Sequence, residues 1–86
     1  MNFLTNYYKI IIPDGHKYTK DYIINNLLNH VAPDTLVPIK YRAKGNEANF
    51  VVDDKKVAVA LLHCEITVIR GEKLTVLVRK PPFPGV

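Results

Sequence analysis

The sequence contains no serine, tryptophan or glutamine, and it has a single cysteine, Cys64. The absence of serine excludes a serine nucleophile. One cysteine can neither form an internal disulfide nor make a cysteine-rich metal site by itself, which favours a reducing compartment, the cytosol or the nucleus. The apolar runs are far shorter than the roughly 20 residues needed to span a bilayer, and the N-terminus lacks the basic-then-apolar order of a signal peptide. We therefore expect neither membrane insertion nor secretion.

Side chains capable of catalysis or metal binding are present, but their spacing fits neither role. The eight acidic residues include no obvious acid–base pair. His16, His30 and His63 lack the spacing of metal ligands. His63 and Cys64 together offer at most two ligands, whereas zinc usually takes three or four. We therefore predict that the chain is not an enzyme and needs no metal or cofactor.

What the chain does contain is typical of one small globular domain. Of its 86 residues, 48% are hydrophobic and 23% are charged, which argues against disorder. The 12 Lys and Arg exceed the 8 Asp and Glu, and this mild excess suits phosphate-bearing partners among others. We expect the folded domain to cover 7–80, with 1–6 as an N-terminal flank. The proline-rich end, 81–86, is expected to begin a linker toward a following domain.

The apolar pattern changes between strand and helix periods along the chain. The β-branched and aromatic run at 7–13 indicates a strand that stops at the turn sequence Pro13-Asp14-Gly15. A helical period follows Thr19, which can cap the helix N-terminus, and it ends before Pro33. Asp53-Asp54 likewise supplies an N-cap for the second helix. The expected elements, in chain order, are strand 7–13, helix 19–31, strand 36–42, strand 47–52, helix 54–63, and a hairpin of 65–69 and 73–80 that leads into the last strand.

This element order, βαββαβ, is typical of the ferredoxin-like α+β sandwich. Because crossover connections are right-handed, we expect one four-stranded antiparallel sheet in the order 4-1-3-2, with both helices on one face. Pro38 falls inside the second predicted strand. Since proline lacks a hydrogen-bond donor and is tolerated mainly at sheet edges, Pro38 supports an edge position for that strand.

Alternation along the strands divides the side chains of the sheet between two faces. We expect the helix-covered face to carry Tyr8, Ile10, Ile12, Ile39, Tyr41, Ala48, Phe50, Val52, Leu74, Val76 and Val78. We expect the opposite face, which no element of the chain covers, to carry Lys9, Ile11, Lys40, Arg42, Glu47, Asn49, Val51, Thr75, Leu77 and Arg79.

A βαββαβ domain with an uncovered sheet resembles the RNA recognition motif, in which aromatic side chains on the first and third strands stack on bases. In this sequence the outward aromatic positions are occupied by Lys9, Glu47 and Asn49. Without a stacking platform, we expect RNA contacts to be made mainly to phosphates and with low sequence specificity. The basic side chains predicted for these contacts are Lys9, Lys40, Arg42 and Arg79.

The same face also supports an alternative function. Ile11, Val51 and Leu77 are expected to form an apolar strip on it. Exposed apolar patches mark interaction sites in many proteins. A protein–protein interaction module that uses the uncovered sheet face therefore remains the alternative to RNA binding.

Several short stretches occur in a defined order: YYKIIIPDGHKYTKDYII at 7–24, Pro38-Ile39, ANFVVDD at 48–54, AVALL at 58–62, and the adjacent prolines Pro81 and Pro82. In order and spacing they resemble the RNP-type domain of the metazoan nuclear RNA export factors, the TAP family. The resemblance extends from about Tyr7 to Pro82. Two features depart from the family pattern: His16 replaces a basic loop residue, and Lys40 and Arg42 make the second strand more basic.

The resemblance implies an RNA-binding module within a longer export adaptor. It implies single-stranded or structured RNA as the ligand, a neighbouring leucine-rich-repeat domain, and further protein partners bound outside this segment. It also implies a location in the nucleus, with shuttling to the cytoplasm left open. By matching positions, the implied RNA contacts are Lys9 on the first strand, Lys17 in the loop that follows it, and Asn49 on the third strand.

Overall fold

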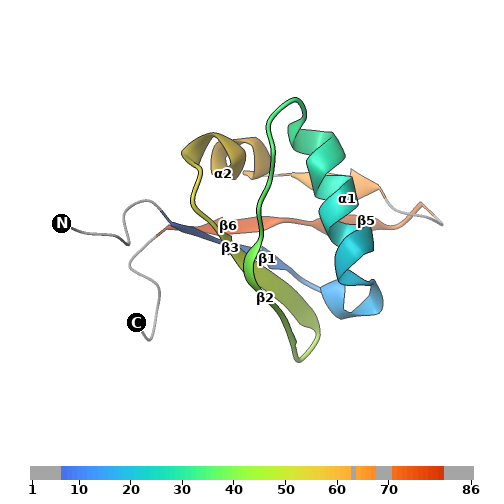
Figure 1. Ribbon diagram of the computed structural model, residues 1–86. Helices are drawn as coiled ribbons and strands as arrows, with labels where there is room; N and C mark the ends of the chain where they lie inside the picture. The colour runs from blue at the N-terminus through green and yellow to red at the C-terminus, as the bar shows by residue number, and fades with distance from the viewer. Residues whose placement is uncertain (1–6, 63, 68–70, 81–86) are drawn as a thin grey trace.

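Four antiparallel strands form the main sheet, and two helices lie on one side of it (Figure 1). The computed structural model describes residues 7–62, 64–67 and 71–80. The strand order is β2 (Ile39–Lys44), β3 (Glu47–Val52), β1 (Tyr8–Ile12) and β6 (Leu77–Arg79). The helices are α1 (Lys20–Val31) and α2 (Lys55–Leu61). The first and third strands are therefore central, which confirms the predicted ferredoxin-like fold and its 4-1-3-2 order.

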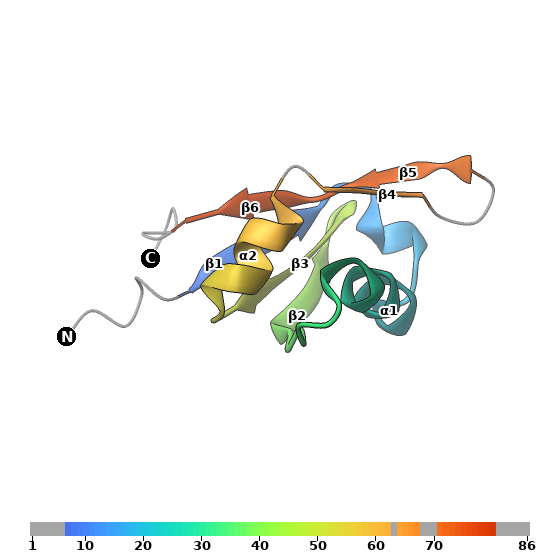
Figure 2. The same cartoon turned by 90° about the horizontal axis from the view of Figure 1, so that it is seen from above.

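A second, two-stranded sheet extends beyond the main one (Figure 2). It pairs β4 (Glu65–Thr67) with β5 (Lys73–Thr75), and only Val76 separates β5 from β6. The backbone N–H of Val76 donates to the carbonyl oxygen of Cys64, 3.0 Å away. This confirms a hairpin that leads into the last strand, while 68–70 of the predicted hairpin lie outside the described residues.

Side-chain caps fix the starts of both helices. Thr19 Oγ1 accepts a hydrogen bond of 3.2 Å from the Tyr22 N–H at the start of α1. Asp54 Oδ1 accepts one of 2.8 Å from the Lys56 N–H at the start of α2. Both caps satisfy backbone donors that have no partner within the helix, as expected from the sequence. Helix α2 ends at Leu61, with Leu62 as its C-cap, and is therefore shorter than the predicted helix 54–63.

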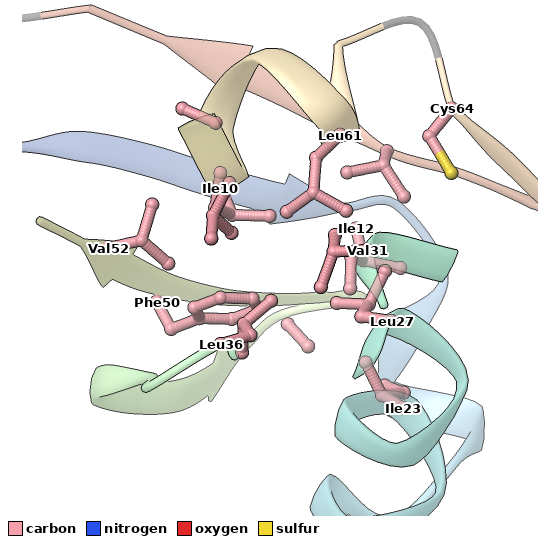
Figure 3. Packing of buried hydrophobic residues seen from close by; sticks show 14 of the residues in the cluster. Ile10, Ile12, Ile23, Leu27, Val31, Leu36, Phe50, Val52, Leu61 and Cys64 are labelled. Carbon is pink, nitrogen blue, oxygen red and sulfur yellow. The ribbon is translucent and has the colours of Figure 1, made fainter. Parts of the chain in front are cut away.

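The hydrophobic core lies between the helices and the covered face of the main sheet (Figure 3). The strands contribute Ile10, Ile12, Phe50 and Val52, all at most 2% exposed, and α1 contributes Ile23 and Leu27. Phe50 also stacks on Tyr41, with ring centroids 5.8 Å apart and an interplanar angle of 16°. The predicted direction of Phe50, toward the helices, is therefore confirmed.

The second strand differs from its prediction. It begins at Ile39 instead of Leu36 and runs to Lys44, so Pro38 precedes the strand instead of lying inside it. The position of β2 at the sheet edge is nevertheless as predicted. Pro38 thus ends the preceding loop and takes no part in the pairing of β2 with β3.

A β-bulge also interrupts β2. Ile39 pairs with Val51 and Arg42 pairs with Asn49, so that Lys40 and Tyr41 together oppose one residue of β3. Lys40 adopts the left-handed region, with φ of 53°. Because one inserted residue reverses the side-chain alternation, Ile39 shares the uncovered face with Val51. The prediction that Ile39 faces the helices was therefore wrong. The placement of Lys40 on the uncovered face was also wrong, because it assumed a strand without a bulge.

The end of the chain requires one further correction. The sequence predicts Leu74 and Thr75 on the two faces of the main sheet, but both lie in β5 of the two-stranded sheet. Leu74 still joins the core and is 5% exposed, while Thr75 is exposed. The break at Val76 separates these two residues from β6.

Candidate functional site

The uncovered face of the main sheet is defined by the residues that alternate with the core positions, and we call it the open face. Cross-strand pairing arranges its side chains in rows. The first row, from β6 to β2, is Arg79, Lys9, Val51 and Ile39. The second row is Leu77, Ile11, Asn49 and Arg42. A third, shorter row consists of Glu47 and Lys44.

Basic side chains occupy two separate corners of the open face. Lys9 and Arg79 are directly paired across β1 and β6 and form one corner, and Arg42 and Lys44 on β2 form the other. Strand spacing and residue rise place the two corners on the order of 15 Å apart. Lys9 is half-buried and the other three are exposed. No ion pair joins any of these four cations to a carboxylate in the described part of the chain, so their charges are available to a ligand.

Apolar side chains run diagonally between the two corners. They are Leu77, Ile11, Val51 and Ile39. Leu77 is 41% exposed, whereas Ile11 is only 8% exposed. Ile39 joins the predicted strip of Ile11, Val51 and Leu77 because of the bulge. The strip therefore exists, but Leu77 is the member most available to a partner.

Asn49 lies near the middle of the open face, yet it is only 5% exposed. It is paired with Ile11 of β1 on one side and Arg42 of β2 on the other. Its Nδ2 donates a hydrogen bond of 3.1 Å to Oε2 of Glu47, which is half-buried on the same strand. Its neighbours therefore cover most of Asn49, and the carboxylate fixes the orientation of its amide.

Lys17 is not brought together with the other predicted contacts. It ends the short 3₁₀ helix η2 (Gly15–Lys17), which follows β1. The backbone N–H of His16 and its ring Nδ1 both bond to the carbonyl oxygen of Asn46, at 3.2 and 2.6 Å. Lys17 lines a shallow depression of about 440 Å³, whose other lining residues include Tyr18 and Glu72. This depression lies outside the rows of the open face.

Lys40 also stands apart from the rows, because the bulge leaves it without its own partner in β3. In contrast, the sequence-based prediction missed Lys44, which pairs with Glu47 on the open face. Counting from the Gly45-Asn46 turn could have found it, since Lys44 and Glu47 flank that turn and directly opposed residues share a face. Of the six predicted contacts, Lys9, Arg42, Asn49 and Arg79 lie on the open face, and Lys17 and Lys40 do not belong to its rows.

Within the described residues, no three His, Cys, Asp or Glu side chains gather in a way that could hold a metal ion. No helix in that part of the chain is long and apolar enough to span a membrane. Burial raises the pKa of the Cys64 thiol, and the neighbouring Glu65 carboxylate raises it further. A thiol in this environment keeps its proton at neutral pH and is a poor nucleophile.

Comparison with known proteins gives two findings. A family model described as Tap, RNA-binding matches residues 7–84. The human protein Nuclear RNA export factor 2 is 34% identical over 59 residues, which is 69% of this chain and 9% of the human protein. The chain therefore spans less than a tenth of the length of that relative.

Proposed function

The chain belongs to the Tap RNA-binding domain family, and on that premise we propose that it binds RNA through the open face of its sheet. The observation that supports this location is the pair of basic corners, Lys9 with Arg79 and Arg42 with Lys44. No described carboxylate forms an ion pair with them. Unpaired cations on a β-sheet surface suit the phosphates of a nucleic acid backbone.

In this proposal an RNA strand crosses the open face from one basic corner to the other. Each corner holds phosphate groups, and the chain between them passes over the diagonal of Leu77, Ile11, Val51 and Ile39. Because Lys9, Glu47 and Asn49 occupy the positions where related sheets carry stacking aromatics, most of the affinity comes from the release of counterions. We therefore expect moderate affinity, strong salt dependence and low sequence specificity.

We further propose that the domain serves a longer RNA export adaptor. The relative named Nuclear RNA export factor 2 is far longer than this chain, which covers 9% of it. The proposed adaptor works in the nucleus, carries a leucine-rich-repeat domain beside this one and binds further protein partners. The proposed ligands are single-stranded or structured RNA.

A second candidate function is docking of a protein on the same face. The observation in its favour is Leu77, which is 41% exposed at one end of the apolar diagonal, with the half-buried Val51 and Ile39 at its other end. A protein partner would be held by apolar contacts, so Leu77→Asp would abolish its binding and neutral substitutions at the corners would matter little. RNA binding responds in the opposite way to these two kinds of variant.

The test is RNA binding by fluorescence anisotropy at several salt concentrations, with each corner neutralised in turn. The variants are Lys9→Gln with Arg79→Gln, and Arg42→Gln with Lys44→Gln. For single-stranded RNA, each lost phosphate contact lowers the slope of log affinity against log salt by about 0.7. Each double variant should therefore lose up to about 1.4 units of slope, by similar amounts for different RNA sequences.

The matched control neutralises two exposed lysines on α2, Lys55 and Lys56. It removes the same charge from the protein but leaves the open face intact. We expect the control to lower affinity slightly through net charge and to keep the salt slope. If the control lowers the slope as much as the corner variants do, the open face is not the RNA-binding surface.

A further inference from the structure

We propose that Glu47 and Asn49 form a pair of hydrogen-bond acceptors that favours RNA bases carrying an exocyclic amino group over uracil. The inference rests on the proposed function, because a base reaches these residues only if RNA crosses the open face. It adds a base preference to a surface whose affinity is expected to come from phosphates. Asn49 lies between the basic corners and Glu47 lies beside the corner formed by Arg42 and Lys44, where a base attached to a held phosphate can reach them.

The first observation is the fixed orientation of the Asn49 amide. Asn49 is 5% exposed, and its Nδ2 lies 3.1 Å from Oε2 of Glu47. An ionised carboxylate only accepts hydrogen bonds, so the amide must turn its NH₂ group toward Glu47. The carbonyl oxygen Oδ1 is therefore held away from Glu47.

The second observation is that acceptor oxygens remain unused. Across the described part of the chain, no donor is bonded to Oδ1 of Asn49 or to the second carboxylate oxygen of Glu47. The described residues also contain no side-chain polar atom that is both buried and unpaired. Since these two oxygens have no partner among the described residues, they must be in contact with solvent. A ligand on the open face therefore meets acceptors at this point.

The third observation is the position of the pair beside a basic corner. Asn49 is directly opposite Arg42, and Glu47 is directly opposite Lys44. Directly opposed residues have Cβ atoms about 4.5 to 5.5 Å apart. Neither cation forms an ion pair with Glu47 among the described residues. A phosphate held by Arg42 or Lys44 thus brings its own or an adjacent base to the acceptors.

The chemistry of the bases decides which ones suit two acceptors. Cytosine, adenine and guanine each carry an amino group that donates hydrogen bonds, and a Glu carboxylate pairs well with the N4 amino group of cytosine. Uracil has a carbonyl oxygen, O4, at the position where cytosine carries its N4 amino group. The one donor on this edge of uracil, N3–H, lies between two carbonyl oxygens, so an acceptor that approaches it is repelled by those oxygens. The pair of acceptors therefore favours cytosine partly because it disfavours uracil.

Glu47 also lowers the affinity for every RNA, because its negative charge repels phosphates. Replacing it with glutamine should strengthen binding in general and most of all for uracil, since the new amide can donate to a uracil oxygen. The preference of the unaltered chain for cytosine over uracil should be on the order of fivefold, at the low end of what a bidentate base contact contributes.

The experiment compares oligocytidine and oligouridine of equal length by fluorescence anisotropy at one salt concentration. These two pyrimidines have similar size and stacking area, so the amino group is their main difference. We expect the unaltered chain to bind oligocytidine about fivefold more tightly. In Glu47→Gln the ratio should fall to near one, because oligouridine gains the most affinity.

The matched control is Glu65→Gln, which removes the same charge from an exposed residue of β4, outside the main sheet. It should leave the ratio unchanged. Oligonucleotides of N4,N4-dimethylcytidine, whose N4 has no hydrogen, test the same contact without altering the protein. They should bind the unaltered chain no better than oligouridine does. This test needs no protein variant, so it can be done even if Glu47→Gln fails to fold.

Three results would overturn the inference. Measurable but equal binding of oligocytidine and oligouridine would refute the base preference and leave the proposed function intact. A cytosine preference that persists in folded Glu47→Gln would remove Glu47 from the contact. No binding of either oligonucleotide at low salt would refute both the inference and the proposed function.

Discussion

Phe50→Ala is the substitution that most directly probes how the central strand supports the open face. Phe50 is fully buried on β3, pairs with Ile10 of β1 and stacks on Tyr41 of β2. Its neighbours along the strand, Asn49 and Val51, point to the open face. The substitution therefore opens a cavity directly beneath the candidate RNA-binding surface.

The magnitude follows from the burial and the ring stacking. Phe→Ala substitutions in cores cost about 3 to 5 kcal/mol, and part of this cost here is the lost aromatic pair with Tyr41, about 0.5 to 1.5 kcal/mol. A chain of 86 residues has a free energy of unfolding of roughly 4 to 13 kcal/mol. For a domain of this size, 1 kcal/mol shifts the melting temperature by roughly 4 to 8 °C. We therefore expect Tm to fall by at least about 12 °C.

The assay is thermal unfolding followed by circular dichroism. The matched control is Val59→Ala on α2, which also shortens an apolar side chain but at a position that is 59% exposed. The control should change the free energy of unfolding by less than about 0.5 kcal/mol. A Tm of Phe50→Ala within a few degrees of the unaltered chain would contradict the assignment of Phe50 to the core face.

Two further predictions concern Gly15 and Cys64. A Cβ atom at Gly15 would lie 2.8 Å from the Cβ of Ala48 on the central strand β3. Gly15→Ala should therefore lower the free energy of unfolding by about 1 to 3 kcal/mol, measured by urea unfolding. An unchanged urea midpoint would contradict the close packing of η2 against β3. Burial raises the pKa of Cys64 in the folded chain, so the folded state favours the protonated thiol. The contribution of this thiol to the free energy of unfolding is complete below its ordinary pKa and is lost as pH rises through the raised pKa. A thiol reagent should accordingly label the native chain at pH 7.5 much more slowly than the urea-unfolded chain, and equal rates would exclude this account.

Most of the fold could be predicted because its determinants are local in the sequence. The change from strand to helix period after Thr19, and the cap at Asp54, mark boundaries that the structure reproduces. The β-bulge at Lys40 and Tyr41 could not be predicted in this way. An inserted residue carries no mark of its own, and lysine is an uncommon choice for a positive φ. Residues before and after the bulge follow opposite alternation, so a pattern counted back from Tyr41 and Arg42 places Ile39 on the wrong face.

Part of the candidate site could also be predicted, because the direction of a side chain on a regular strand follows from local alternation. Lys9, Asn49 and Arg79 lie on strands without a bulge, so simple alternation placed them correctly. The separation of the cations into two corners depends on strand order and register together, which alternation alone does not give. The hydrogen bond from Asn49 to Glu47 was also not foreseen, although residues two apart on a strand share a face.

The measurement that tests the central claim most directly is the salt dependence of RNA binding by the whole chain. Unstructured single-stranded RNA is titrated by anisotropy, and the variant neutralised at Lys9, Arg79, Arg42 and Lys44 is compared with the unaltered chain. Four phosphate contacts predict a log–log slope of roughly −2.8 for the unaltered chain and a slope near zero for the variant. RNA binding by a folded variant with the slope of the unaltered chain would contradict the proposal that the open face holds the RNA.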